Sequence, residues 1–415
     1  MHVVAAFVIA AAALSCAYQA AQFLAAWRFL RRPRRPIEAD ADQTFTPPIT
    51  VLKPLKGPGL DLYANLASFC RQDYPEYEIV FGVSDRNDPA IAVVERLRRD
   101  FPHRRLVLVI GDTHAKAAQR QTANGKIANL IRMMPHARHD VLVMSDADIR
   151  VRPDYLRAMV APLADPRVGL STCLYRGRGY FGLPSVLESL FINTHFVPMI
   201  LLDQFVQRFR RAYGASIALR REALERIGGF APIADHLADD NLLGRRVSDA
   251  GYRLVLLPYV VETVLDATTM ADVWRHQLRW ARTYRVCQPV GWFFSMVTQT
   301  VSWGVLAVLV TRGSTTGWLV LAASLACRLG SLAGTLQLLR ERDMLRRLWL
   351  VPLYDLGYSI LWTASWLSRE VNWSGERLHV GRDGRMTPVP AARRASATVT
   401  ALTPAVDGGR RIARR

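Results

Sequence analysis

The feature that most constrains this chain is an apolar run over residues 3–27 that contains no charged side chain. A helix of about 20 apolar residues crosses the hydrocarbon layer of a membrane, so the run suits one spanning segment. Five arginines follow it: Arg28, Arg31, Arg32, Arg34 and Arg35. A cleaved signal peptide carries its basic residues before the apolar run. The sequence therefore predicts an uncleaved anchor over residues 1–36, with the arginines in the cytoplasm and the N-terminus outside.

Three more apolar segments lie in the C-terminal part, over residues 290–311, 317–339 and 348–368. We expect a membrane region over residues 289–368. The second segment contains Arg328 and the third contains Asp355. Charged side chains inside a membrane are costly and face the protein interior. We therefore expect these two side chains to form a pair, unless each lies near a helix end.

The sequence leaves open on which side of the membrane residues 369–415 lie. Three further spans would carry this tail outside, whereas its basic character, and that of residues 340–347, favours the cytoplasm. Either one segment does not span, or the tail lies too far from the membrane for its charge to matter. Enrichment in Pro, Ala, Gly and Arg predicts disorder after about residue 380.

Charge and composition narrow the class of protein. The 415 residues include 54 Lys and Arg against 35 Asp and Glu, a net charge of +19, and 50% are hydrophobic. This hydrophobicity excludes wholesale disorder. The positive charge flanks apolar runs and lacks interleaved aromatic residues, which indicates a membrane surface and no nucleic acid as partner. Five scattered cysteines without metal-ligand spacing predict free thiols in a reducing compartment.

Residues 37–288 have the pattern of one large α/β domain. Strand-like runs cover residues 49–52, 78–83, 105–110 and 140–144, and helical patterns cover residues 89–100 and 126–134. This alternation predicts a mostly parallel sheet. Ligands of such sheets bind at the carboxyl ends of the strands, where Asp85 and Asp146 stand.

The strongest chemical signal is Asp146-Ala147-Asp148, directly after the strand at residues 140–144. Two carboxylates at a strand end can project into one crevice. Their hard oxygen atoms suit Mg²⁺ or Mn²⁺ held jointly with a diphosphate. Asp85 and Asp88 follow the strand at residues 78–83. They can hold a base or a ribose, or form an ordinary acidic turn before a helix.

Three further groups are less specific. Lys126 stands near a helix start, where it can serve a phosphate or be plain surface. Asp239 and Asp240 stand at the start of another helix. One of them can act as a general base, or the two acids can simply form a favourable N-terminal turn. The run from His276 to Trp280 (HQLRW) can neutralise a leaving diphosphate and close an acceptor site, or form an amphipathic helix at the membrane.

Taken together, the order of these groups resembles the family 2 and family 21 glycosyltransferases with a GT-A domain, most closely the ceramide glucosyltransferase group. The likeness covers roughly residues 1–380. It includes VLKPLKG at residues 51–57, DYP at 73–75, DPAI at 88–91, IRV at 149–151, the Arg-Trp pair at 279–280, and WSGER at 373–377. Bacterial hopanoid-associated glycosyltransferases share the same pattern. The resemblance implies an α/β GT-A domain, mostly parallel in its sheet, with transmembrane helices at both ends.

The resemblance also implies roles for the residues. Asp88 would be the first motif acid, with Asp85 against the nucleotide. Asp146 and Asp148 would bind the metal, Mg²⁺ or Mn²⁺, and the diphosphate. Asp240 would be the catalytic base beside Asp239, and Arg279 and Trp280 would complete the last motif.

Two histidines and one lysine complete the expected substrate-binding set. His276 stands where the family has Gln or Arg. His195 lies where animal members have a functionally sensitive histidine, although a lone histidine is also commonly structural. Lys126 would contact the donor.

The reaction that the resemblance implies is inverting transfer of one hexose from a UDP-sugar to a lipid hydroxyl at the bacterial inner membrane, with the catalytic domain cytoplasmic. The acceptor is ceramide with UDP-glucose, or a hopanoid polyol with UDP-N-acetylglucosamine. The apolar residues 186–205 either receive the lipid or form a buried helix. A polysaccharide synthase is less favoured, because three C-terminal segments are few for a channel.

Overall fold

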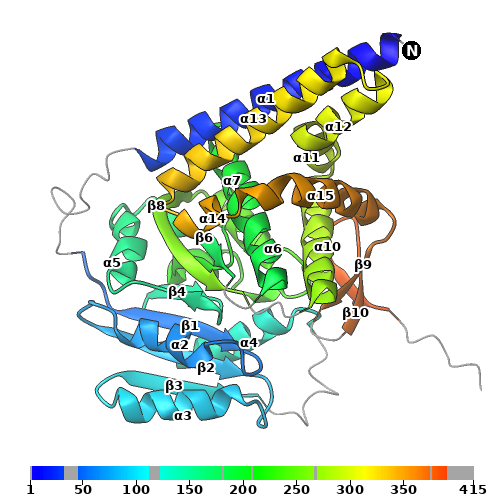
Figure 1. Ribbon diagram of the computed structural model, residues 1–415. Helices are drawn as coiled ribbons and strands as arrows, with labels where there is room; N and C mark the ends of the chain where they lie inside the picture. The colour runs from blue at the N-terminus through cyan, green and yellow to red at the C-terminus, as the bar shows by residue number, and fades with distance from the viewer. Residues whose placement is uncertain are drawn as a thin grey trace, which may run out of the picture.

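The structure is a computed structural model that describes residues 2–31, 45–111, 122–179, 182–206, 209–265, 269–373 and 376–389. Arg32, Arg34, Arg35, part of the motif at residues 373–377, and residues 390–415 lie outside these ranges. Figure 1 shows a sheet domain at one end of the molecule and long helices, α1 and α13 among them, at the other.

One eight-stranded sheet forms the centre of the domain, in the order β3-β2-β1-β4-β7-β6-β8-β5. The strands are β1 Ile49–Leu55, β2 Tyr77–Val83, β3 Arg105–Ile110, β4 Val141–Ser145, β5 Ile149–Arg150, β6 Val168–Arg178, β7 Ser216–Arg220 and β8 Arg253–Val264. β1 pairs in parallel with both β2 and β4, and Ile49 lies opposite both Tyr77 and Val141. The carboxyl ends of these three strands therefore meet at one edge. The antiparallel strands β7 and β5 complete a mixed but mostly parallel sheet, as predicted.

Helices cover both faces of the sheet because its strands alternate apolar side chains between the faces. Val51 and Ile79 pack against one set of helices, and their neighbours Leu52 and Val80 pack against the other. The first set comprises α2 Leu62–Cys70, α3 Ala90–Asp100 and α5 Tyr155–Val160. The second comprises α4 Gly125–Met133, α8 Arg221–Arg226 and α9 Asp239–Asp249. The predicted strands and helices are confirmed, with boundaries that shift by a few residues.

The remaining helices form a bundle that rests on the domain (Figure 1). They are α1 His2–Leu30, α6 Leu183–Phe191, α7 Val197–Val206, α10 Met270–Cys287, α11 Pro289–Phe294, α12 Thr300–Val310, α13 Thr315–Leu338, α14 Arg342–Leu345 and α15 Val351–Trp366. A π-helical segment, Ile192–Phe196, joins α6 to α7. All five cysteines are free, as expected.

Three helical stretches are long and apolar enough to cross a membrane: His2–Leu30, Leu183–Val206 and Thr315–Leu338. In the second, 78% of the most apolar window is buried inside the protein, against 28% in each of the others. α1 and α13 run side by side in the same direction: Ser331 Oγ donates to the Gln19 carbonyl at 2.8 Å, and Gly334 lies against Phe23. Both helices therefore end on the same side of the bundle (Figure 1).

Two of the predicted spans need correction. Residues 290–311 do not form one helix, because the chain bends by 57° between Pro289–Thr298 and Thr300–Val310. Residues 348–368 contain α15, which has 16 residues. At about 1.5 Å per residue this helix is shorter than the hydrocarbon layer of about 30 Å. Hydropathy alone does not reveal the bend or the short helix.

The expectation of disorder after residue 380 is corrected for residues 381–389, whereas residues 390–415 lie outside the described ranges. β9 Glu370–Trp373, β10 Glu376–Val380 and β11 Met386–Pro388 form a small antiparallel sheet. It packs on the sheet domain, where the Met386 amide donates to the Asp235 carbonyl at 2.7 Å and Leu378 lies in a cluster with Leu237. After α15 the chain therefore packs on the sheet domain again, and the side of the membrane on which the tail lies stays a prediction.

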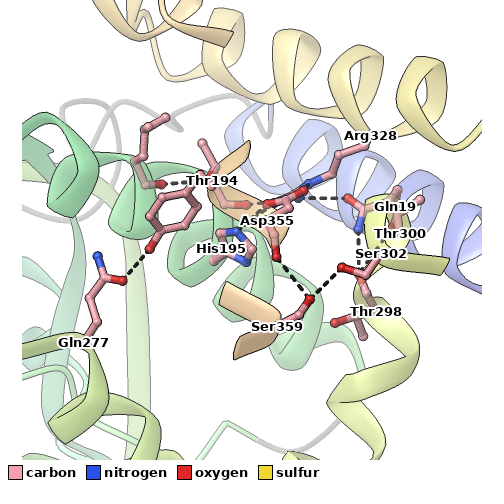
Figure 2. A network of polar contacts seen from close by, with 12 residues as sticks. Gln19, Thr194, His195, Gln277, Thr298, Thr300, Ser302, Arg328, Asp355 and Ser359 are labelled. Atoms are coloured by element: carbon pink, nitrogen blue, oxygen red, sulfur yellow. Dashed lines mark hydrogen bonds and ion pairs between the residues drawn. The ribbon is translucent and has the colours of Figure 1, made fainter. Parts of the chain in front are cut away.

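The predicted pair of Arg328 and Asp355 is confirmed. Arg328 Nε lies 2.9 Å from Asp355 Oδ2, and both side chains are buried. Figure 2 shows how the pair joins separate helices: Arg328 also donates to Gln19 Oε1 on α1 at 3.1 Å and to the Thr194 carbonyl at 3.2 Å. His195 Nε2 lies 2.9 Å from Asp355 Oδ1. The network therefore fixes α1, α13, α15 and the π-helical segment relative to one another.

We predict that Arg328→Met lowers the free energy of unfolding by about 3–5 kcal/mol, because it leaves Asp355 buried without its counter-charge. The double variant Arg328→Met/Asp355→Leu should recover most of this loss. Thermal unfolding of the detergent-solubilised chain measures both variants. Arg312→Met, in the exposed turn before α13, serves as the control. A double variant no more stable than Arg328→Met alone would contradict the pairing.

Candidate active site

The acidic motif follows β4, at the edge where the carboxyl ends of the parallel strands meet. Asp148 Oδ2 accepts a hydrogen bond from Thr263 Oγ1 on β8 at 2.6 Å. Asp146 Oδ1 lies 2.6 Å from Lys126 Nζ, and its side chain is 37% exposed. Asp148 is thus held by a strand and Asp146 by a helix, and both carboxylates remain accessible to solvent.

Lys126 is brought to this edge by the start of α4. The Asn124 side chain caps the helix, accepting from the amides of Lys126 and Ile127 at 3.1 and 3.2 Å. Lys126 Nζ lies 4.0 Å from Asp239 Oδ2 as well as next to Asp146. Burial opposes the charge of this ammonium group, but Asp146 and Asp239 together raise its pKa above the ordinary value. Lys126 is therefore an ammonium group placed between the two acidic motifs.

Asp239 and Asp240 form the first turn of α9. Asp240 Oδ2 accepts from the Gly214 amide at 2.7 Å, and Oδ1 accepts from the Asn241 amide at 2.7 Å. A Cβ atom at Gly214 would lie 3.2 Å from Asp240 Oδ2, so glycine permits this close approach. Burial raises the pKa of Asp240, although Lys126 and the two amides oppose the shift. The geometry provides an oriented carboxylate with raised basicity.

Lys53 belongs to this site and was missed as a site residue. It is fully buried, and its Nζ donates to the Asp146 carbonyl at 2.5 Å while lying over the Phe69 ring. Burial lowers the pKa of Lys53 to about 7, although Asp148 and Asp146 act in the opposite direction. The signal available in the sequence is a lysine inside an apolar strand, since fully buried lysines are rare without a partner.

The Arg-Trp pair lies on α10, whose start is fixed by a capping box between Thr269 and Asp272. Burial lowers the pKa of Arg279, whereas Glu188 and Asp239 raise it. Arg279 therefore stands within the electrostatic range of the acidic cluster. Trp280 lies against Phe191, with 5.2 Å between ring centroids.

His276 makes a contact that the sequence did not suggest. Its Nδ1 bonds to Glu188 Oε1 on α6. Glu188 is buried and is the one acid in the apolar helix α6, which is the signal that points to it. The pair holds α10 against α6, so His276 positions the helix that carries Arg279 and Trp280.

Asp85 and Asp88 lie after β2, at the same edge of the sheet. Asp88 accepts from the Gly57 amide with both oxygens, at 3.1 and 3.0 Å, and from the Ala90 amide at 2.9 Å. Asp85 Oδ1 accepts from the Asn87 amide at 3.0 Å. Asp88 thus joins the loop after β1 to the start of α3, a structural role that accompanies any contact with the nucleotide.

His195 does not lie at the acidic edge of the sheet. Figure 2 places it in the bundle beside Asp355 and Arg328. Its ring lies 4.5 Å from that of Tyr358 and is stacked on Phe191, which in turn contacts Trp280. A contact between His195 and a substrate stays a prediction. The partners that the structure gives it, Asp355 and two aromatic rings, indicate that it positions neighbouring helices.

The donor set fits a divalent metal. Among the residues that the structure describes, no three His, Cys, Asp or Glu side chains gather around one point as a complete metal cage. Asp146 and Asp148 are two hard oxygen donors, and Mg²⁺ commonly takes one or two carboxylates and completes its shell with water and phosphate oxygens. These two residues would therefore hold the ion together with a diphosphate.

Comparison with known proteins identifies the family of the chain. The profile of the family described as glycosyl transferase family 21 matches residues 7–386. The chain belongs to this family. It is therefore a glycosyltransferase.

Individual relatives are more distant. Ceramide glucosyltransferase 3 of Caenorhabditis elegans is 23% identical over 58% of this chain and 51% of its own length. Ceramide glucosyltransferase of Gibberella zeae is 30% identical over 40% of this chain and 32% of its own. The chain thus spans about half or less of the curated relatives that it matches. A solved mannosyltransferase of Pyrobaculum calidifontis, in complex with GDP-Man and Mn²⁺, is similar with a TM-score of 0.49 and 23% identity, covering 85% of this chain and 98% of the other.

We predict that Lys126→Met weakens UDP binding about ten- to hundredfold, as expected for losing a hydrogen bond from a charged group. Isothermal titration of the detergent-solubilised protein measures this. Lys126→Arg, which keeps the charge, should lose less, and Arg99→Met, on the exposed face of α3, should bind UDP as the wild type does. Unchanged UDP affinity in Lys126→Met would remove Lys126 from the donor site.

Proposed function

We propose that this chain is a membrane-bound, inverting glycosyltransferase that moves one hexose from a UDP-sugar to a lipid hydroxyl, with UDP-glucose and ceramide as the first substrate pair. The observation that carries the proposal is the edge of the sheet where Asp146, Asp148, Lys126 and Asp240 meet. It combines a metal and diphosphate site with an oriented carboxylate base.

On the donor side, the diphosphate of UDP would lie against Lys126 and Arg279. A divalent ion held by Asp146 and Asp148 supplies Lewis-acid stabilisation of the leaving diphosphate. Lys53 fixes the turn of the acidic motif through the Asp146 carbonyl. Lys126 and Arg279 add positive charge where the leaving group becomes more negative.

On the acceptor side, Asp240 would take the proton of the lipid hydroxyl. The acceptor oxygen then bonds to the anomeric carbon as the bond from that carbon to the UDP phosphate oxygen breaks, and UDP leaves. A single attack from the face opposite UDP inverts the configuration, so an α-linked donor yields a β-glycoside. The two amides that hold Asp240 orient its carboxylate for this step.

A lipid acceptor is supported by the aromatic contacts between the bundle and α10, the helix that carries Arg279. Trp280 contacts Phe191 and Phe196 of the apolar stretch Leu183–Val206. These aromatic side chains belong to one apolar cluster with Phe29 of α1 and Leu336 of α13. Ceramide is favoured as acceptor because the relatives are named ceramide glucosyltransferases.

The location proposed is the inner membrane of a bacterium with the catalytic domain cytoplasmic. Arg28, Arg31 and the arginines that follow α13 lie at the ends of α1 and α13 that face the sheet domain, and positive charge marks the cytoplasmic side.

Asp240→Asn should lower the transfer rate at least about a hundredfold, since a positioned general base contributes 10²–10⁴-fold. UDP affinity should stay near that of the wild type. The matched control is Asp249→Asn, at the other end of α9, where the carboxylate pairs with Arg210 at the surface. Product formation is measured by mass spectrometry, and wild-type turnover in Asp240→Asn would exclude Asp240 as the base.

Removal of divalent metal by EDTA should abolish transfer, and Mg²⁺ or Mn²⁺ should restore it. Asp146→Asn should raise the metal concentration needed for half-maximal rate, because it removes one of only two protein carboxylates. Asp140→Asn, directly before β4 at the opposite end of the strand, should not. Full activity after chelation would show that the acidic motif works without a metal.

The acceptor is tested by offering UDP-glucose and UDP-N-acetylglucosamine, each with ceramide and with a hopanoid polyol, to the purified protein. We expect glucosylceramide as the product. An N-acetylglucosaminyl hopanoid would instead assign the second pair. No product from any pair, while UDP still binds, would refute both acceptors but not the donor site.

A further inference from the structure

Arginines gather at one end of the bundle, where α1 and α13 both end. We call this set the basic rim; its members are Arg28, Arg31, Arg340, Arg342, Arg346 and Arg347. All are exposed except the half-buried Arg347. None of their side chains forms an ion pair with a carboxylate within the described ranges of the chain. At the other end of α13, the corresponding turn carries Arg312 alone.

The backbone at the end of α13 sets the position of two of these arginines. The Glu341 amide donates to the Leu336 carbonyl at 2.8 Å, and the Arg340 amide donates to the Gln337 carbonyl at 3.0 Å. Arg340 has a φ of 59°, so the helix ends in a left-handed residue of the Schellman type. The chain reverses here, and α14 begins at Arg342.

A cavity of about 500 Å³ lies at this reversal. It is lined by Gln337, Arg340, Glu341, Arg342 and Leu345. The one acid in this lining, Glu341, is buried and forms an ion pair with Arg176 of β6. Its charge is therefore compensated from the side of the sheet domain, and the cavity presents the positive charge of Arg340 and Arg342.

Large apolar side chains continue from the basic rim along the chain. Trp349, two residues after Arg347, is 73% exposed, and Leu353 in the first turn of α15 is 72% exposed. Exposed tryptophan next to arginine at the end of a spanning helix is typical of the level of lipid headgroups. Clusters of about four to eight Lys and Arg directly cytoplasmic of a spanning helix are typical of sites that bind anionic lipids.

We propose that the basic rim binds the headgroup of an anionic phospholipid, with Arg340 and Arg342 on its phosphate and Trp349 among the adjacent lipid tails. The proposal rests on the membrane placement given above and not on the sugar-transfer reaction. The proposal gives the chain reversal after α13 a function. The headgroup would hold the reversal in place, where Glu341 pairs with Arg176. The Arg176 guanidinium also contacts Glu262 on β8. The residue after Glu262 is Thr263, which orients Asp148.

The test uses the full chain in a neutral detergent, without sugar donor. The probes are a short-chain phosphatidylglycerol, phosphatidylcholine of the same chain length, and inorganic phosphate. Native mass spectrometry counts retained lipid, and thermal unfolding reports binding because a ligand of the folded state raises its stability. We expect phosphatidylglycerol to bind and stabilise the wild type, and phosphatidylcholine and phosphate to do neither.

The deciding variant is Arg340→Gln/Arg342→Gln, which should bind phosphatidylglycerol about 30-fold more weakly, from about 1 kcal/mol for each arginine. The matched control is Arg99→Gln/Arg312→Gln, which removes the same charge from α3 and from the opposite end of α13. It should bind like the wild type.

Equal binding of phosphatidylcholine, or unchanged phosphatidylglycerol affinity in the double variant, would overturn the proposal. Stabilisation by inorganic phosphate alone would overturn the lipid in favour of a free anion. Because no sugar is transferred in these measurements, their failure is distinguishable from failure of the proposed transfer reaction.

Discussion

The guanidinium of Arg328 lies among mostly apolar helices, where removing its partner would cost about 3–5 kcal/mol. It satisfies this requirement with Asp355, Gln19 and the Thr194 carbonyl, which come from three different elements. The bundle therefore has one favourable register. Two hydrogen bonds connect this bundle to α10. The Tyr354 hydroxyl of α15 donates to Gln277 Oε1 at 2.8 Å, and Glu188 of α6 bonds to His276. The helix that carries Arg279 and Trp280 is thus positioned from the bundle, while the acidic motifs are positioned from the sheet.

Charge balance organises the other half of the site. Asp146, Asp148, Asp239 and Asp240 would repel one another without the cations between them. Lys126 contacts two of these acids, and Lys53 supports the turn of the first motif from below. The arrangement suits a substrate that brings both negative phosphate and a positive metal ion. The metal ion can then pair with the carboxylates and the phosphate with Lys126, so no buried charge is left without a partner. This is the physical basis for placing a nucleoside diphosphate here.

Several features followed from the sequence for clear reasons. Short apolar runs located the strands, and the acids after two of them located the edge of the sheet where ligands bind. The pair of Arg328 and Asp355 followed from the cost of a charge in an apolar segment. The bend between Thr298 and Thr300 and the shortness of α15 did not follow, because apolar composition is the same in straight, bent and short helices. The role of Lys53 was missed because its partner is a backbone carbonyl 93 residues away.

By itself, the sequence determined the α/β domain between apolar helices, the acidic motifs, and membership of a glycosyltransferase family, since these depend on local periodicity and on short runs of residues. Only the tertiary structure decided which side chains share a site. It places Lys126 between Asp146 and Asp239, places His195 in the bundle, and packs β9–β11 against the catalytic domain. Such partnerships join residues far apart in the chain. They arise because buried charges and backbone groups must find partners wherever the packing brings them together.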